Sequence, residues 1–338
     1  MPAHLPPDAR PHHRIWPSRL PLTLAIPETT VWFNLEVTAR RFPRKAAYVF
    51  LGRPLSFGEL HDQALALAGW LQAQGVKKGD RVILYLQNCP QWAVAFHAIQ
   101  RADAVVVPVN PMNRADELGH YITDPGARVA ITSADLAGPL HQASQALPPA
   151  QRLRALLVTR FTDAMPPLAD IAEAEKPAAP IFDWLRADVP PVAGAVTWAE
   201  ALSAGLQPGP GSAGPDDLCV LPYTSGTTGL PKGCMHSHRT LMPNIVGGGL
   251  WGQTTAEAVA LGVVPMFHIT GLMFSVLANV YLGSTTVLMP RWDRELAGRL
   301  IARHRITHWT CIPTMVIDLF GSPNYRSFDL SSLRRLAG

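Results

Sequence analysis

Short apolar runs alternate with helix-like patterns along most of this chain, and this alternation constrains the fold more than any other feature. Apolar residues within 60–71 recur on one helix face, and Gly75 follows as a stop signal. Strand-like runs and helix-like segments then alternate: strands at 81–86, 104–107, 128–132 and 153–158, and helices from Pro90, at 115–123 and at 135–146. Asn88 is the candidate cap of the helix that begins at Pro90. The expected fold class is α/β, with doubly wound, mostly parallel sheets and helices on both faces.

The alternation is interrupted once and then resumes. Residues 162–217 are rich in proline, alanine and glycine, with one short helical piece at 198–202, which is typical of a connecting region. The second series is expected to hold strands at 218–222, 259–264, 285–288 and 307–311, and helices from His238, at 270–281, at 294–304 and at 314–320. We therefore predict a proline-rich arm (1–21), a first α/β subdomain (22–161), a connection (162–217) and a second α/β subdomain (218–338).

Composition excludes several classes of protein. Apolar residues make up 48% of the chain and charged residues 16%, which describes a globular protein rather than a disordered one. The net charge of +4 is scattered, without the basic stripe that nucleic-acid binding requires. The four cysteines form no CxxC pair, which is typical of a reducing cytoplasm, and no apolar run reaches the length of a transmembrane segment. The N-terminal 27 residues hold seven prolines and lack the apolar core of a signal peptide.

The segment 223–233 reads Tyr-Thr-Ser-Gly-Thr-Thr-Gly-Leu-Pro-Lys-Gly and lies between two apolar runs. Glycines allow close backbone approach to a ligand, and their amides, with hydroxyl donors and a lysine charge, are suited to a polyphosphate. A Walker A loop needs glycine before the lysine and serine or threonine after it. Here Pro231 precedes Lys232 and Gly233 follows, so a different kind of phosphate loop is indicated.

This ordered segment resembles the signature of the adenylate-forming (AMP-binding) superfamily, which includes acyl-CoA synthetases, luciferases and the adenylation domains of peptide synthetases. Shorter stretches at 88–90, 105–111 and 264–268 are also similar to the family. The resemblance covers residues 22–338, is of the fatty-acid–CoA ligase type, and implies the first portion of the family's large N-terminal domain. Asp103 is a departure, because relatives usually carry glycine there.

The resemblance implies an ATP-dependent carboxylate–CoA ligase, which first adenylates an acid and then forms a thioester with CoA. Lys232 and His268 are the expected catalytic residues. The residues expected to bind ATP are Thr224, Ser225, Gly226, Thr227, Thr228, Gly229, Lys232 and Gly233. The Thr224 hydroxyl is expected near Mg²⁺ that accompanies ATP. His268, Gly271 and Leu272 are expected on the side of the carboxylic acid.

Some residues have alternative interpretations. A lone histidine such as His268 is by default a hydrogen-bonded structural residue. His236 and His238 are spaced as a metal pair, but no third ligand is evident, so both are assigned to a helix start. The run 247–249 of three glycines either ends a helix or leaves room for an acyl chain. Residues that line such a tunnel, or equally a core, are Trp251, Met266, Leu272, Met273 and Phe274.

The family's later motifs, for adenine, ribose and the catalytic lysine of the C-terminal domain, match nothing in this chain. We therefore expect a sequence truncated before them, a parent ligase for medium- or long-chain fatty acids or aryl acids, and an isolated chain without activity. One alternative is an acyl-AMP ligase that passes the acyl group to a carrier protein. Another is a catalytically silent structural or nucleotide-binding module. A cytoplasmic location is expected, and a homodimer is compatible with the resemblance.

Overall fold

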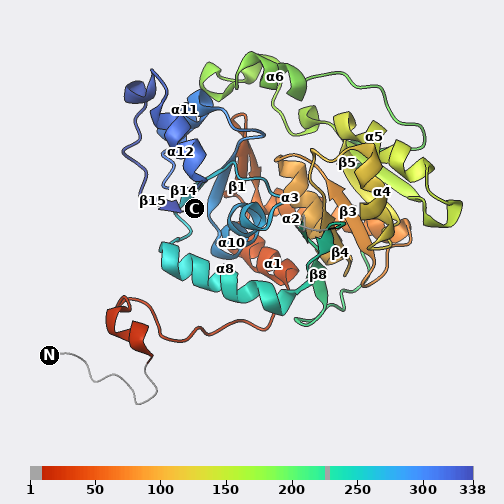
Figure 1. Ribbon diagram of the computed structural model, residues 1–338, viewed down its shortest axis with the longest axis horizontal. Helices are drawn as coiled ribbons and strands as arrows, with labels where there is room; N and C mark the ends of the chain where they lie inside the picture. Colours follow the sequence, from red (N-terminus) through yellow and green to blue (C-terminus); the bar gives the residue numbers. More distant parts are fainter. Residues whose placement is uncertain (1–9, 225–228, 338) are drawn as a thin grey trace.

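Two open sheets with helices on their faces make up the body of the protein (Figure 1). The computed structural model describes residues 10–224 and 229–337. The larger sheet has seven strands in the order β11 (His236–Ser237), β8 (Leu218–Val220), β4 (Val105–Pro108), β3 (Arg81–Tyr85), β5 (Val129–Ser133), β6 (Ala155–Thr159) and β7 (Val196–Thr197). All neighbours in it are parallel except β11, which is antiparallel to β8.

The second sheet has six strands in the order β15 (Arg335–Ala337), β14 (His308–Thr310), β12 (Val259–Gly262), β13 (Thr285–Leu288), β1 (Ala46–Phe50) and β2 (Arg53–Ser56). Only β2 is antiparallel to its neighbour. Each sheet therefore draws strands from both of the ranges 22–161 and 218–338, and the predicted division into subdomains at these boundaries stays a prediction. The α/β class with mostly parallel sheets is confirmed.

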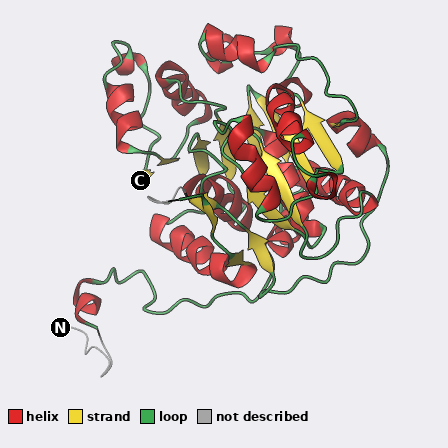
Figure 2. Ribbon diagram, turned by 45° about the vertical axis from the view of Figure 1, so that its right-hand side comes forward, coloured by secondary structure: helices red, strands yellow, loops and turns green. Residues whose placement is uncertain are grey.

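Helices cover both sheets, as the red ribbons around the yellow strands in Figure 2 show. They are α1 (Val31–Arg41), α2 (Phe57–Ala73), α3 (Pro90–Arg101), α4 (Ala115–Thr123), α5 (Ala134–Gln145), α6 (Ala179–Leu185), α7 (Trp198–Ser203), α8 (His238–Gly252), α9 (Ile269–Gly271), the π-helix η6 (Leu272–Leu277), α10 (Ala278–Leu282), α11 (Arg294–His304) and α12 (Pro313–Phe320). The 3₁₀ turns are η1 (Pro11–Ile15), η2 (Pro149–Gln151), η3 (Phe161–Asp163), η4 (Leu168–Asp170), η5 (Glu173–Glu175) and η7 (Tyr325–Ser327). No helix in the described ranges combines the length and hydropathy that crossing a bilayer requires.

Local signals in the sequence explain where the principal helices begin. Ser56 and Glu59 form a capping box at the start of α2, and Pro90 occupies the first turn of α3. The Ser237 hydroxyl accepts the Thr240 amide at the start of α8. Gly75, two residues beyond α2, has a φ of +77°, which favours glycine.

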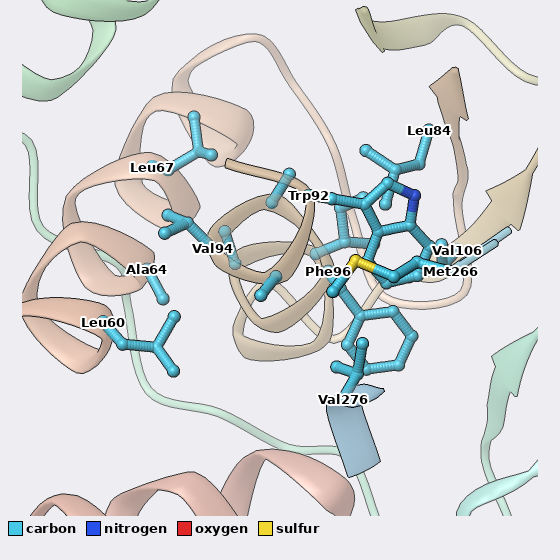
Figure 3. Close-up of a cluster of buried hydrophobic side chains, with 14 of the residues drawn as sticks. Leu60, Ala64, Leu67, Leu84, Trp92, Val94, Phe96, Val106, Met266 and Val276 are labelled. Atoms are coloured by element: carbon cyan, nitrogen blue, oxygen red, sulfur yellow. The ribbon is translucent and has the colours of Figure 1, made fainter. Parts of the chain in front are cut away.

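The centre of the molecule is α3, which contacts strands of both sheets. Its residues from Pro90 through Gln100 are all buried, so this helix is covered on every side. Figure 3 shows Leu60, Ala64 and Leu67 of α2 facing the α3 side chains, with Val276 and Met266 on the other side. The largest hydrophobic core therefore joins the two sheets rather than belonging to one of them.

The connection 162–217 is more structured than predicted. The helical piece at 198–202 is confirmed as α7, but α6 and strand β7 were missed. The Glu175 carboxylate, 2% exposed, accepts contacts from Nε of Arg303 and Nε2 of His304, both at 2.7 Å. A buried carboxylate needs such partners, so this cluster fixes the connection to α11.

Asp103 has a left-handed backbone conformation, with a φ of +57°. Glycine adopts this conformation most easily, which gives a physical reason for glycine at such a position. The Asp103 carboxylate accepts the Ser212 amide at 2.6 Å and the Ser212 hydroxyl at 2.9 Å. These two hydrogen bonds attach the connection to the turn before β4.

Candidate functional site

Two short strands hold the ends of the predicted phosphate loop. β9 (Tyr223–Thr224) pairs antiparallel with β10 (Lys232–Gly233), with Lys232 opposite Thr224. Residues directly opposite each other in an antiparallel pair project on the same face, so the threonine hydroxyl and the lysine ammonium are available to one ligand. Both side chains are exposed. The predicted phosphate contacts Ser225, Gly226, Thr227 and Thr228 lie outside the described residues.

The part of the loop that leads into β10 has features suited to an anion. Gly229 has a φ of +103°, a conformation open to glycine almost alone, so this position requires the glycine of the motif. Lys232 forms no salt bridge with any carboxylate of the described residues. An exposed ammonium without an internal partner can act as a point charge toward a phosphate.

The two halves of the candidate site follow strands of different sheets. β8 precedes the loop in the seven-stranded sheet, and β12 precedes His268 in the six-stranded sheet. Ligands of open α/β sheets bind beyond the carboxyl ends of the strands, which is where both segments lie. Helix α8, which follows the loop, packs against η6 and α10, which follow His268. Helix α8 therefore links the segment that follows the loop to the helices that follow His268.

His268 is exposed and caps the short helix α9. Its Nδ1 accepts the Thr270 amide at 3.3 Å, and its carbonyl accepts the Leu272 amide at 2.9 Å. A neutral imidazole that accepts at Nδ1 carries its proton on Nε2. That N–H is then free to donate to a carboxylate or phosphate oxygen.

The other two residues predicted on the acid side are buried beneath His268. A Cβ added to Gly271 would lie 2.0 Å from the Pro265 carbonyl oxygen, so the helix after His268 touches the backbone before it. Leu272 is fully buried in the hydrophobic core. Gly271 thus shapes the turn that presents His268, and the predicted substrate contact of Leu272 stays a prediction.

Asn88 has a role that sequence reasoning missed. The expected cap of α3 is wrong, because Cys89 occupies the cap position. Asn88, 3% exposed, accepts the Met266 amide at 2.8 Å and donates to the Val263 and Val264 carbonyls, each at 3.2 Å. It therefore satisfies the backbone of the segment between β12 and His268, which has no strand partner there.

A cavity of about 130 Å³ lies between α8, the η6–α10 helix and strands β14 and β15. Its walls include Gly248, Gly249, Trp251, Phe274 and Leu282. Of the predicted tunnel residues, Trp251 and Phe274 line it. The remaining predicted tunnel residues, Met266, Leu272 and Met273, are core residues.

The three glycines do not end α8, which runs through them to Gly252, so that interpretation is wrong. A Cβ on Gly248 would lie 3.3 Å from the Phe274 ring, and one on Gly249 would lie 3.1 Å from Leu282. The missing side chains therefore let α8 approach the η6–α10 helix closely, and they leave the cavity between them open.

His238, near the start of α8, has a structural role. His238 is 2% exposed, and its Nδ1 accepts the Val31 amide at 3.2 Å. Burial lowers the pKa of His238 to about 4, so the ring is neutral near pH 7. His238 is the first residue of α8, and His236 lies two residues before it, in β11.

Comparisons with known sequences give a consistent result. The family model of the AMP-binding enzymes matches residues 35–338. A long-chain-fatty-acid–CoA ligase of Bacillus subtilis (strain 168) is 31% identical over 328 residues, covering 94% of this chain and 56% of the relative. 4-Coumarate–CoA ligase 3 of Oryza sativa subsp. japonica is 30% identical over 287 residues, which cover 84% of this chain and 46% of the relative. The chain spans about half the length of the curated relatives it matches.

Solved structures share the fold. An anthranilate–CoA ligase in complex with anthranoyl-AMP superposes with a TM-score of 0.75 at 23% identity, over 94% of this chain and 55% of that one. A long-chain-fatty-acid–CoA ligase from Archaeoglobus fulgidus gives a TM-score of 0.73 at 21% identity, over 93% and 58%. At this level of identity the similarity establishes the architecture of the two sheets, not the substrate.

Proposed function

The chain belongs to the family of AMP-binding enzymes, and from this premise we propose that it carries the phosphate loop and part of the acyl site of an ATP-dependent carboxylate–CoA ligase. The observation that carries the proposal is the exposed pair of Thr224 and Lys232 across the β9–β10 hairpin, in a segment with the family's signature. CoA is the acceptor we favour over a carrier protein, because the matched relatives are CoA ligases by name.

The proposed reaction has two steps. A carboxylate oxygen attacks the α-phosphorus of ATP, and the bond to pyrophosphate breaks. The thiol of CoA then attacks the acyl carbonyl, loses its proton, and releases AMP. The first step brings two anions together, so the protein must neutralise charge and align the triphosphate.

Residues of this chain fit those tasks. Lys232 places its ammonium on the departing pyrophosphate, and the Nε2–H of His268 donates to an oxygen of the acid or the acyl phosphate. Mg²⁺ prefers oxygen ligands and is held largely by nucleotide phosphates, so a Thr224 hydroxyl beside those phosphates suits it. When bound, Mg²⁺ supplies positive charge against the triphosphate. The loop residues Ser225, Gly226, Thr227 and Thr228 are proposed as further phosphate contacts.

Replacing Lys232 with alanine is expected to lower the rate of acid-dependent ATP–pyrophosphate exchange about 100-fold. The variant lacks the positive charge that stabilises the negative charge developing on the leaving pyrophosphate. The assay uses the full-length protein encoded by the gene and a panel of fatty and aryl acids. Lys77→Ala is the control and should retain full activity, because Lys77 is an exposed lysine in a turn distant in sequence from the phosphate loop. Absence of exchange with every acid in the panel would rule out the ligase.

The cavity beside α8 is the proposed site of the acyl chain, and a medium- or long-chain fatty acid is the substrate we favour. Gly248→Val adds an isopropyl group to the cavity wall near Phe274. We expect it to raise KM for a twelve-carbon acid about 10-fold, with little change for a four-carbon acid. Gly247→Val, on the same helix but against Leu24 rather than the cavity, is the matched control. Equal effects of the two variants on both acids would place the acyl chain elsewhere.

A further inference from the structure

One helix, α4, contacts both ends of the phosphate loop. The His120 ring donates from Nε2 to the Pro231 carbonyl at 2.7 Å. The Tyr223 hydroxyl donates to the carboxylate of Asp124, the C-cap residue of α4, at 2.5 Å. Tyr223 precedes Thr224 and Pro231 precedes Lys232, so each anchored residue is the immediate neighbour of a proposed ligand of ATP.

Ring packing reinforces these two hydrogen bonds. The Tyr223 ring lies 4.8 Å from the Tyr121 ring, and 5.9 Å from the His120 ring in an edge arrangement, measured between centroids. A Cβ on Gly233 would lie 3.2 Å from the Tyr223 ring, so that ring also covers the backbone of β10. Burial, and then the hydrogen bond to Asp124, raises the pKa of the Tyr223 hydroxyl, which therefore remains a donor at neutral pH.

The hairpin needs such external support. Within the described residues β9 and β10 pair over two residues each, and isolated two-stranded hairpins are marginally stable even when longer. Proline has no N–H, so the carbonyl is the only backbone group through which Pro231 can be held by a hydrogen bond. The register of Lys232 against Thr224 therefore depends on contacts from outside the hairpin.

We propose that His120 and Asp124 are positioning residues, which fix the spacing of Thr224 and Lys232 for the phosphates of ATP. The proposal rests on the proposed function, because it assigns the ligand of the hairpin. Neither residue touches ATP in this role, since both act through the backbone or ring of a neighbour. The contact of His120 needs a donor at Nε2, and both the matching neutral tautomer and the protonated ring supply one.

The test compares His120→Leu, which removes the donor, with His120→Gln, which keeps an N–H donor. His120→Leu should raise KM for ATP about 10-fold in the exchange assay, leave KM for the acid unchanged, and speed hydrogen exchange of the 229–234 amides several-fold. His120→Gln should recover most of both effects. Asp124→Ala should act in the same direction as His120→Leu. His141→Leu, which changes a histidine of α5, is the matched control.

Three outcomes separate the possibilities. If His120→Leu leaves KM for ATP unchanged while the unsubstituted protein is active, the positioning role is wrong and the ligase stands. If amide exchange rises throughout the protein in His120→Leu and His120→Gln alike, the residue has a general structural role, and the proposal is again wrong. If the unsubstituted protein shows no exchange activity with any acid, the proposed function fails, and the assignment of ATP fails with it.

Discussion

Replacing Gly271 with alanine is expected to lower the free energy of unfolding by about 3 kcal/mol or more, because overpacking against rigid groups is costly. The added Cβ would lie 2.0 Å from the Pro265 carbonyl oxygen and 2.6 Å from that of Val264. These are backbone atoms, which cannot rotate away as a side chain does. Relief requires the start of α9 to move, and His268 caps that helix. The variant should therefore also lose most acid-dependent ATP–pyrophosphate exchange.

The measurement is urea unfolding followed by circular dichroism, with Gly119→Ala as the control. Gly119 also lies inside a helix, but its added Cβ would meet only Leu147, at an ordinary 3.8 Å. Alanine in a helix interior is favoured over glycine, so this control should gain about 0.5–1 kcal/mol. Equal stabilities of Gly271→Ala and the unsubstituted protein would show that the turn at His268 is not packed as described.

Acid is expected to destabilise the fold by about 4 kcal/mol between pH 7 and pH 5 through two buried histidines. Burial lowers the pKa of His97 to about 3 and that of His238 to about 4. An unfolded histidine titrates near pH 6.5, so in this window the unfolded state binds more protons than the folded state. Stability is therefore full above about pH 7, falls as the pH drops through 6.5, and stops falling below the folded pKa values.

Single variants separate the two contributions. Both ring nitrogens of His97 lack hydrogen-bond partners among the described residues, so His97→Leu should cost little at pH 7 and remove about half of the acid effect. His238→Gln keeps a polar group near the Val31 amide and should remove the other half. His12→Gln, on the exposed arm, should change nothing. The measurement is urea unfolding at intervals from pH 7.5 to pH 4.5, and an unchanged pH slope in His97→Leu would contradict the assignment.

Much of the fold could be predicted because its signals are local. The apolar period of 60–71, the proline at position 90 and the run at 81–86 each mark an element that the structure contains as α2, α3 and β3. The way in which each sheet combines strands from distant parts of the chain could not be predicted from local signals. β1 pairs with β13 in register Tyr48 to Thr286, and no local pattern encodes a pairing over that separation. Strand β7 was missed because two residues give no period.

The same distinction between local and distant signals applies to the candidate site. The phosphate loop was recognisable because its residues are contiguous, and its predicted contacts with ATP stay predictions. The residues that support it are not contiguous with it. Asn88 was taken for a helix cap because it precedes Pro90, yet its side chain turns toward the segment at 263–266. His120 belongs to no sequence motif, and its role is seen only in its contacts with the Pro231 carbonyl and the Tyr223 ring.

The pairing of strands that are distant in the chain also affects the order in which the sheet can form during synthesis. The parallel neighbour of β1, β13, follows it about 240 residues later in the chain, and synthesis of that stretch takes roughly 12–50 s at usual elongation rates. During that interval one edge of the β1–β2 hairpin is unpaired, although the α2 and α3 residues that contact it are already made. The nascent chain therefore carries an unpaired apolar strand edge for longer than most small domains take to fold, and residues 46–50 are a target for a chaperone that binds extended segments.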